Sequence, residues 1–340
     1  MRLPSTLRVG LTITAAAAFL LCMLFAIETP QAAAARADQK DQIQKAQHQI
    51  EAGDYAAAIT ALQSVISIEP GSADGHYWLG RAFYENRDFE NAIAQGEKAV
   101  AIDPKISVYH QWLGRAYGGQ ADRDRSFSMA RKVKKEFEEA VRLDPSNIAA
   151  RRDLEEFCLD APWIVGGSKD EARSQVEAIA AADPLEGHLA RAVLDKDQGK
   201  IDVEENEYRQ VLNAKPSRVE PYFEAAEFFQ RQNRPADMQA AIQAAAAVSP
   251  NDARLGYYRG VAGVLSGGAA GAQAEQYLKA YVASTPNKSD WPPHAAAREW
   301  LGRLYESQGK RAEAAEQYRA ALQLDPGRKE ARTRLDKLSH

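Results

Sequence analysis

Prolines recur through this chain at nearly even intervals, and this spacing limits the possible folds more than any other feature. Eight of them lie 32 to 41 residues apart: Pro70, Pro104, Pro145, Pro184, Pro216, Pro250, Pro286 and Pro326. A period of this length is typical of a repeat made of two short helices and their turns. Because proline cannot continue a helix, each one ends a unit and leads the chain into the next. The spacing therefore predicts an all-α solenoid of about eight stacked units.

When the units are aligned on their prolines, small and large residues fall at matching positions. One position of the first helix holds Gly80, Gly114 and Gly302. One position of the second helix holds Ala58, Ala92, Ala172 and Ala314, and another holds larger side chains: Leu62, Phe137, Tyr208, Ile242, Leu278 and Tyr318. Small residues let paired helices approach closely, so we expect these positions to be buried between helices. Glu204 departs from the pattern, because it stands where alanine is expected in the fifth unit.

These repeated residues resemble the tetratricopeptide repeat family, most clearly in two units. The second unit carries Trp78, Leu79, Gly80, Ala82 and Phe83, and the last carries Trp300, Leu301, Gly302, Leu304 and Tyr305. The resemblance covers residues 38–326 and implies a right-handed superhelix, with residues 327–340 as a C-terminal capping helix. The segment from Gly114 to Gly118, with Ala161–Pro162 and Gly166–Gly167, further resembles a set of exported bacterial repeat proteins of unassigned function.

Residues 1–37 have the pattern of an export signal. Arg2 and Arg8 precede an uncharged stretch from Val9 to Ile27, and small residues follow up to Ala37. This order of charged, apolar and small residues predicts cleavage after Ala35 or Ala37 and a periplasmic or secreted protein. The apolar stretch is nearly long enough to span a bilayer. The alternative is therefore an uncleaved anchor in the inner membrane, with the repeats facing the periplasm.

Charge and cysteine content exclude some classes of function. The net charge is −4, so we expect no nucleic-acid partner. Beyond residue 37 the only cysteine is Cys158, which excludes an intramolecular disulfide and which we expect to be a small core residue. We also expect no obligate homo-oligomer.

A search for catalytic motifs finds none that would indicate an enzyme. The sequence has no His-Glu-x-x-His pair, no Gly-x-Ser-x-Gly turn and no paired cysteines for zinc. His76 and His110 occupy the same position in successive units, which repeat equivalence explains better than a metal site. We therefore expect no catalytic residues, no metal and no cofactor.

The family resemblance implies a concave groove lined by the first helix of each unit, which binds a peptide or helix of a partner protein. Carried over by position, it selects eight residues: Tyr77, Arg81, Tyr84, Gln111, Arg115, Arg152, Phe223 and Tyr257. A row of arginines flanked by tyrosines suits carboxylates and aromatic side chains. This predicts a scaffold of the bacterial cell envelope that binds an acidic or aromatic segment. The alternative is a solvated row with pairs such as Arg81 with Glu85. The family's clamp for chaperone tails is not matched.

A cluster of basic residues in the third unit suggests a second interaction surface. It consists of Arg123, Arg125, Arg131, Lys132, Lys134 and Lys135. This basic patch suits an anionic polysaccharide or lipid. The alternative is a solvated helix face neutralised by pairs such as Lys132 with Glu136 and Lys134 with Glu138.

Three insertions interrupt the repeat, at residues 118–128, 159–168 and 287–294. In the first, we expect Gly118 to Gln120 to end a helix. In the second, we expect Trp163 and Ile164 to tuck under neighbouring helices, although an exposed contact is the alternative. The third is rich in proline and predicts a stiff surface spacer, with Trp291 as its anchor or as a contact for a partner.

Overall fold

The computed structural model describes residues 30–338 except residue 269, so most of the predicted export signal lies outside the described residues. Within this part of the chain there are seventeen α-helices, one 3₁₀-helix and no strand. Their bounds are α2 (Pro30–Ala52), α3 (Tyr55–Ile68), α4 (Ala73–Glu85), α5 (Phe89–Ile102), α6 (Ser107–Asp124), α7 (Phe127–Leu143), α8 (Ile148–Asp160), η1 (Trp163–Val165), α9 (Lys169–Ala182), α10 (Pro184–Asp197), α11 (Ile201–Asn213), α12 (Glu220–Arg231), α13 (Pro235–Val248), α14 (Arg254–Ser266), α15 (Ala270–Ser284), α16 (His294–Ser307), α17 (Arg311–Leu324) and α18 (Lys329–Leu338).

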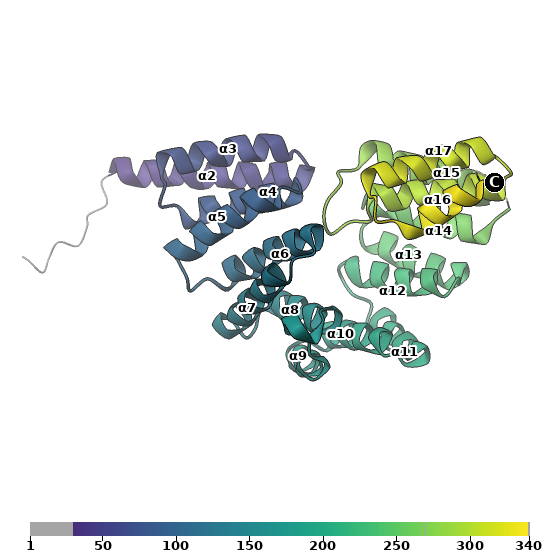
Figure 1. The fold of residues 1–340 in the computed structure, drawn as a ribbon, viewed down its shortest axis with the longest axis horizontal. Helices are drawn as coiled ribbons and strands as arrows, with labels where there is room; N and C mark the ends of the chain where they lie inside the picture. The colour runs from purple at the N-terminus through teal and green to yellow at the C-terminus, as the bar shows by residue number, and fades with distance from the viewer. Residues whose placement is uncertain (1–29, 269, 339–340) are drawn as a thin grey trace, which may run out of the picture.

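The helices pack as successive antiparallel pairs, from α2 with α3 to α16 with α17, which makes eight pairs in the described residues (Figure 1). The last helix, α18, covers the final pair: Ala331 is buried with Tyr305 and Tyr318, and Leu335 packs beside them. The predicted all-α solenoid of about eight units with a C-terminal capping helix is therefore confirmed.

Each pair is held together by the small and large positions that repeat in the sequence. A Cβ added at Gly114 would lie 2.5 Å from the Phe137 ring, and one added at Gly302 would lie 2.5 Å from the Tyr318 ring. The aromatic ring thus lies directly against the glycine of its partner helix. The four matching alanines of the second helix are also buried: Ala58, Ala92, Ala172 and Ala314.

Glu204, the acidic residue at an alanine position of the repeat, forms an ion pair. Glu204 is buried and pairs with Arg231 of α12, while its burial raises the pKa of its carboxyl group. Cys158 is buried in the core between α7, α8 and α9, as expected, and burial raises the pKa of its thiol to about 12. No helix in residues 30–338 is both long and apolar enough to cross a bilayer.

Matching histidines tie successive units together at the proline turns. His76 Nε2 lies 3.0 Å from the Pro70 carbonyl oxygen, and its Nδ1 lies 2.8 Å from Gln95 Oε1. His110 repeats this arrangement with the Pro104 carbonyl oxygen and with Glu136. Both rings therefore fasten the first helix of a unit to the preceding turn and to the second helix.

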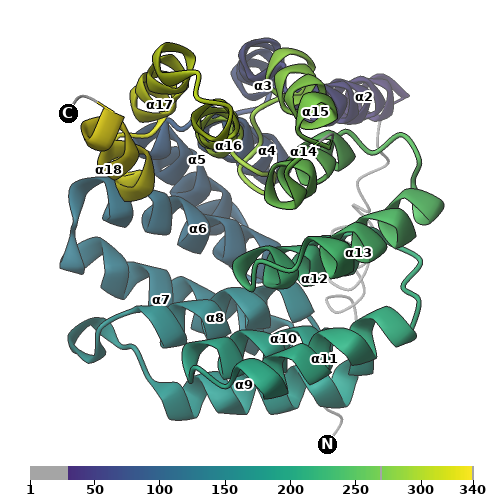
Figure 2. The ribbon, with the colours of Figure 1, turned by 90° about the vertical axis from the view of Figure 1, so that its right-hand side faces the viewer.

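The solenoid curls, so that its late repeats meet its early ones through the third insertion (Figure 2). The loop between α15 and α16 reaches the ends of α3 and α4. There Ser289 donates two hydrogen bonds to the Glu85 carboxylate, from its backbone N–H and from its hydroxyl, each of 3.0 Å. The Tyr55 hydroxyl lies 3.3 Å from the Asn287 carbonyl oxygen. We call residues 286–291 the bridging loop.

This position corrects the expectation for the third insertion. The bridging loop is a tertiary contact between distant repeats, where a surface spacer was expected. Its Trp291 ring faces two cations, Lys288 Nζ at 4.5 Å and the Arg254 guanidinium at 5.5 Å from the ring centroid. Trp291 therefore anchors the loop to α14, which is one of the two roles expected for it.

The expectations for the other two insertions were wrong in part. The helix predicted to end at Gly118 to Gln120 continues to Asp124. Gly119 lies within this helix and makes no turn, and its missing side chain leaves room for the Phe89 ring. The turn comes at Arg125, which has a φ of 52°. In the second insertion, Trp163 is 84% exposed and Ile164 is exposed too, while Val165 is the residue that packs into the core.

Candidate functional site

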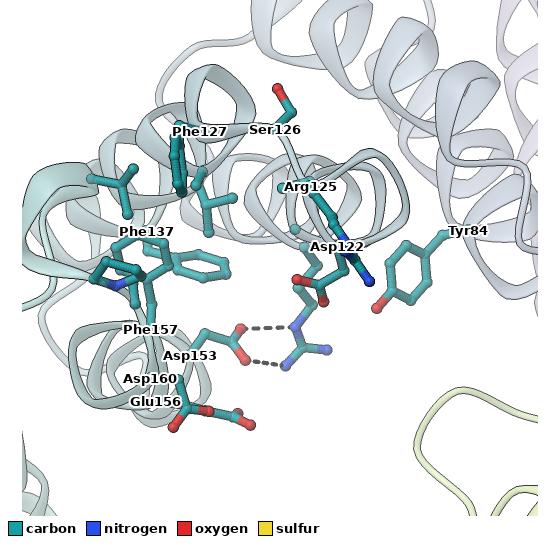
Figure 3. A pocket seen from close by; sticks show the side chains of 18 of the residues that line it. Tyr84, Asp122, Arg125, Ser126, Phe127, Phe137, Asp153, Glu156, Phe157 and Asp160 are labelled. Atoms are coloured by element: carbon teal, nitrogen blue, oxygen red, sulfur yellow. Dashed lines mark hydrogen bonds and ion pairs between the residues drawn. The ribbon is translucent and has the colours of Figure 1, made fainter. Parts of the chain in front are cut away.

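A cavity of about 800 Å³ opens on the inner side of the curled solenoid, between α6, α7 and α8 (Figure 3). We call it the interior cleft. Tyr84 of α4 and the bridging-loop residues Ser289 and Asp290 border it. Because these residues come from repeats far apart in sequence, the cleft depends on the curl of the whole solenoid.

One wall of the interior cleft is apolar. It is formed by α7, α8 and the second insertion, with the side chains of Phe127, Ala130, Val133, Phe137, Phe157, Pro162 and Val165. Val133, Phe137 and Val165 are buried in the core of this region, but Phe127 is 60% exposed. A large, exposed aromatic ring beside a cavity is a common feature of sites that bind other molecules.

The rest of the lining is charged and predominantly acidic. Five carboxylates and two guanidinium groups line the cleft. One carboxylate is neutralised within the protein, because Arg115 Nε and Nη2 donate to both oxygens of Asp153 at 2.8 and 3.0 Å. The second arginine, Arg125, lies on the same side of the cleft as Tyr84 and Asp122 (Figure 3).

Four carboxylates of the cleft have no hydrogen-bond or ion-pair partner among the described residues: Asp122, Glu156, Asp160 and Asp290. Burial, together with the charge of Asp160, raises the pKa of Asp122. Burial also raises the pKa of Glu156, and the neighbouring charges of Asp153 and Asp160 add to this effect. In both groups burial is the larger cause, and a neighbouring negative charge raises the pKa further.

A second cavity of about 270 Å³ adjoins the interior cleft and shares Glu156 and Asp160 with it. Its lining includes Glu155, which is 1% exposed and has both carboxylate oxygens buried without a hydrogen-bond partner. Burial raises the pKa of Glu155 to about 8, an effect that Arg152 opposes. A buried carboxylate without a partner is costly, so it marks a place where a counter-charge is missing.

The predicted arginine row is present, and carboxylates hold two of its three guanidinium groups. Arg81 has no carboxylate partner among the described residues, and its buried Nε has no hydrogen-bond acceptor. The Arg81 guanidinium is stacked between two tryptophan rings, 4.6 Å from the Trp78 centroid and 4.0 Å from the Trp112 centroid. Arg115 is held by Asp153, as described above. Arg152 pairs with Glu224 at 3.3 Å and with Glu186 at 3.6 Å. The alternative pair of Arg81 with Glu85 does not form, because Glu85 accepts the hydrogen bonds of Ser289.

The other predicted groove residues are divided between the cleft and the core. Tyr84 lines the interior cleft beside Arg115, so the structure brings these two together. Gln111 donates to Asp153 at 2.7 Å, and Tyr77 is buried against Tyr109. Phe223 and Tyr257 lie in the core of the later repeats, where Phe223 stacks on Tyr258.

Most cations of the basic patch also have partners. Lys134 pairs with Glu171 at 2.7 Å and with Glu138 at 3.6 Å, the second of which is the helix pair expected from the sequence. Lys132 lies 4.0 Å from Glu97 of α5, where Glu136 was expected, because Glu136 is bonded to His110.

The remaining patch residues point in different directions. Arg123 contacts Gln120 and Asp124, Arg131 lies 3.3 Å from the Ile164 carbonyl oxygen, and Arg125 lines the interior cleft. Lys135 is exposed.

Sequence reasoning missed the acidic side of the cleft, although a signal for it exists. Asp153, Glu156, Phe157 and Asp160 are spaced three and four residues apart, so they share one face of α8. From the sequence alone, that face of α8 looks like an ordinary solvated helix face. The curl of the solenoid is what turns it toward the cleft. The described residues hold no group of three or more His, Cys, Asp or Glu side chains arranged for a metal ion.

Comparisons with known proteins agree with this architecture. Two family models described as tetratricopeptide repeat match residues 43–105 and 295–328. The structure is similar to a tetratricopeptide repeat protein from Parabacteroides merdae, with 13% identity and a TM-score of 0.52 over 89% of this chain and 99% of that one. It is also similar to yeast Tom70, with 14% identity and a TM-score of 0.58 over 84% of this chain and 58% of that one. A third similar structure is the Cut9–Hcn1 hetero-tetramer, with 13% identity and a TM-score of 0.51 over 87% of this chain and 55% of that chain.

At these identities the likeness shows the fold alone. A search of curated proteins found no significant match.

Proposed function

Because the chain is a tetratricopeptide repeat protein, we propose that it is a non-enzymatic scaffold that holds a segment of another protein in the interior cleft. The observation that carries this proposal is the cleft itself. It combines about 800 Å³ of space with an exposed aromatic ring and with charged groups that have no partner among the described residues. A stacked-repeat surface of this kind suits an extended segment or a helix, because successive repeats present contacts at regular intervals.

The place of action we propose is the bacterial cell envelope. The support for it is the export-signal pattern of residues 1–37, with the uncleaved anchor as its alternative. On this proposal the protein is periplasmic or secreted, and it assists the assembly of an envelope complex.

The basic patch gives weaker support to the alternative function, which is binding of an anionic polysaccharide or lipid, than the interior cleft gives to a protein partner. A surface that attracts an anionic polysaccharide or lipid needs cations free of protein partners. Here Lys134 is held by Glu171 and the Gly166 carbonyl oxygen, and Lys132 lies beside Glu97. We therefore place the partner in the interior cleft.

A photo-crosslinking amino acid at position 127 tests the proposal in intact cells. Phe127 is exposed and lines the cleft, so the substituted residue should capture a specific protein, identified by mass spectrometry. The matched control is the same amino acid at position 68, since Ile68 is 84% exposed and lies outside the cleft. Equal yields of the same proteins from both positions, or no protein from position 127, would count against a cleft-binding scaffold.

A further inference from the structure

The charges of the interior cleft indicate what kind of segment it accepts. Among the described residues, Asp122, Glu156, Asp160 and Asp290 line the cavity without a hydrogen-bond or ion-pair partner. Arg115 pairs with Asp153, and Arg125 supplies the other positive charge of the lining, so carboxylates are in excess. An excess of carboxylates around one cavity produces a local negative potential. A cationic group that enters would be stabilised by it, and an anionic group would be repelled.

The apolar wall further limits the kinds of segment that fit the cleft. Phe127 of α7 lies across the cavity from Glu156 and Asp160, whereas Phe157 lies beside them on α8 (Figure 3). An aromatic or aliphatic side chain can pack on this wall while a neighbouring cation reaches the acidic side. Small inorganic cations do not use such a wall, and the described residues include no group of acidic or histidine side chains arranged for a metal ion.

The adjoining cavity adds an independent observation. Glu155 is almost completely buried, and neither of its carboxylate oxygens has a hydrogen-bond partner. It lines the cavity that meets the interior cleft at Glu156 and Asp160. A buried polar group of this kind is rare in folded proteins unless a ligand, an ion or water completes its interactions. Glu155 therefore leaves a buried acidic group unsatisfied next to Glu156 and Asp160, the two residues that the cavities share.

We propose that the occupant of the interior cleft is a protein segment that carries lysine or arginine next to an aromatic or other apolar side chain. This inference rests on the proposed function and names the chemistry of its partner. It replaces the acidic segment expected from the arginine row, because those arginines are engaged by Asp153, by Glu186 and Glu224, or by tryptophan rings.

Titration of these carboxylates gives the proposal a pH dependence. The groups that face Glu155 in the adjoining cavity and from α12 are Arg152, Glu156, Lys196, Asp197 and Glu224. Burial raises the pKa of Glu155 to about 8, so its carboxyl group is mostly protonated at neutral pH. A bound cation favours the ionised form. Affinity for a cationic peptide should therefore increase as the pH rises through about 8.

The test uses three fluorescent peptides of equal length, in which phenylalanine alternates with lysine, with glutamate or with glutamine. Binding to the full chain is measured by anisotropy at low salt. We expect the lysine peptide to bind about tenfold more tightly than the glutamine peptide, which corresponds to about 1.4 kcal/mol, because its cations can pair with several carboxylates of the cleft at once. The glutamate peptide should bind most weakly.

Double variants then test whether the preference for lysine depends on the carboxylates of the cleft. Replacing Glu156→Gln together with Asp160→Asn should weaken the lysine peptide about tenfold and leave the glutamine peptide within about twofold. The control replaces Glu313→Gln and Glu316→Gln, which removes the same charge from exposed positions on α17. It should change lysine-peptide affinity less than about twofold, since distant surface charges are screened by salt.

Other outcomes separate this inference from the function it rests on. If the glutamate peptide binds as tightly as the lysine peptide and both crosslink to position 127, the cleft still holds a protein segment, and the cationic preference is wrong. Equal loss of lysine-peptide binding in the cleft variant and in the α17 control would also overturn it, because the effect would then be one of net charge. If position 127 captures nothing in cells and no peptide crosslinks there, the scaffold proposal fails as well.

Discussion

The contact between the bridging loop and α4 predicts a local opening that can be measured at a single amide. The perturbation is Glu85→Ala, which removes the acceptor of both Ser289 hydrogen bonds. Hydrogen bonds to a charged group contribute about 1.5 to 3 kcal/mol each. Ser289 is exposed, so the lower figure applies to each of the two. The closed position of the loop should therefore lose about 3 kcal/mol, which corresponds to roughly a hundredfold larger open population.

The assay is hydrogen exchange followed by NMR or mass spectrometry. The Ser289 N–H is itself one of the two donors, so its exchange rate reports the loss of the contact between the loop and Glu85. We expect this rate to increase by about two orders of magnitude in Glu85→Ala. Amides in the cores of α8 and α12 should keep their rates, because the change removes no core contact.

Two further variants control the measurement. Ser289→Ala removes the hydroxyl bond and keeps the backbone bond, so it should give about a tenfold increase, half of the effect on a logarithmic scale. Glu90→Ala removes an exposed carboxylate of α5 and should have no effect. The reasoning is refuted if the Ser289 amide exchanges in Glu85→Ala at a rate within about threefold of the original protein, since a loop held by these bonds would have to open faster.

Two other predictions concern the packing of helix pairs. Gly114→Ala should destabilise the protein by about 1 to 3 kcal/mol, because a Cβ there meets the Phe137 ring. Gly118→Ala in the same helix should stabilise it by up to about 1 kcal/mol, because the nearest atom to its added Cβ lies at 4.0 Å. Urea unfolding of both variants measures the two free energies, and equal effects would contradict the prediction. Arg231→Met should cost about 3 kcal/mol by leaving the Glu204 carboxylate buried without its partner, while Glu204→Ala restores the repeat's usual residue and should change stability by less than about 1 kcal/mol. The pKa of Glu204 is already raised in the folded state, so lowering the pH favours the folded form, and the deficit of Arg231→Met should shrink in acid; a deficit that grows in acid would show that the buried charge is not its cause.

The repeat architecture could be predicted because its determinants are local. Proline positions end the units, and glycine or alanine at fixed positions lets each pair of helices pack closely. Gly302 and Tyr318 come from adjacent helices, so their contact follows from the helix pair alone. The eight units and the capping helix are recognisable in the sequence for this reason.

Pairings between side chains were predictable only within a helix. The pair of Lys134 with Glu138 was expected from its spacing and is present. Lys132 pairs instead with Glu97 of the preceding unit, because the expected partner Glu136 is bonded to His110. The competition between partners from different helices cannot be read from spacing along one of them.

The sequence by itself determined the helices, their pairing and the residues between them, because these depend on contacts among neighbours in the chain. Only the tertiary structure decided where the solenoid bends back on itself. That curl brings Ser289 to Glu85 across more than two hundred residues and turns the acidic face of α8 toward Tyr84 and the bridging loop. Small rotations between successive repeats add up over the whole array. The position of the cleft and the sign of its charge therefore emerge only when all the repeats are in place.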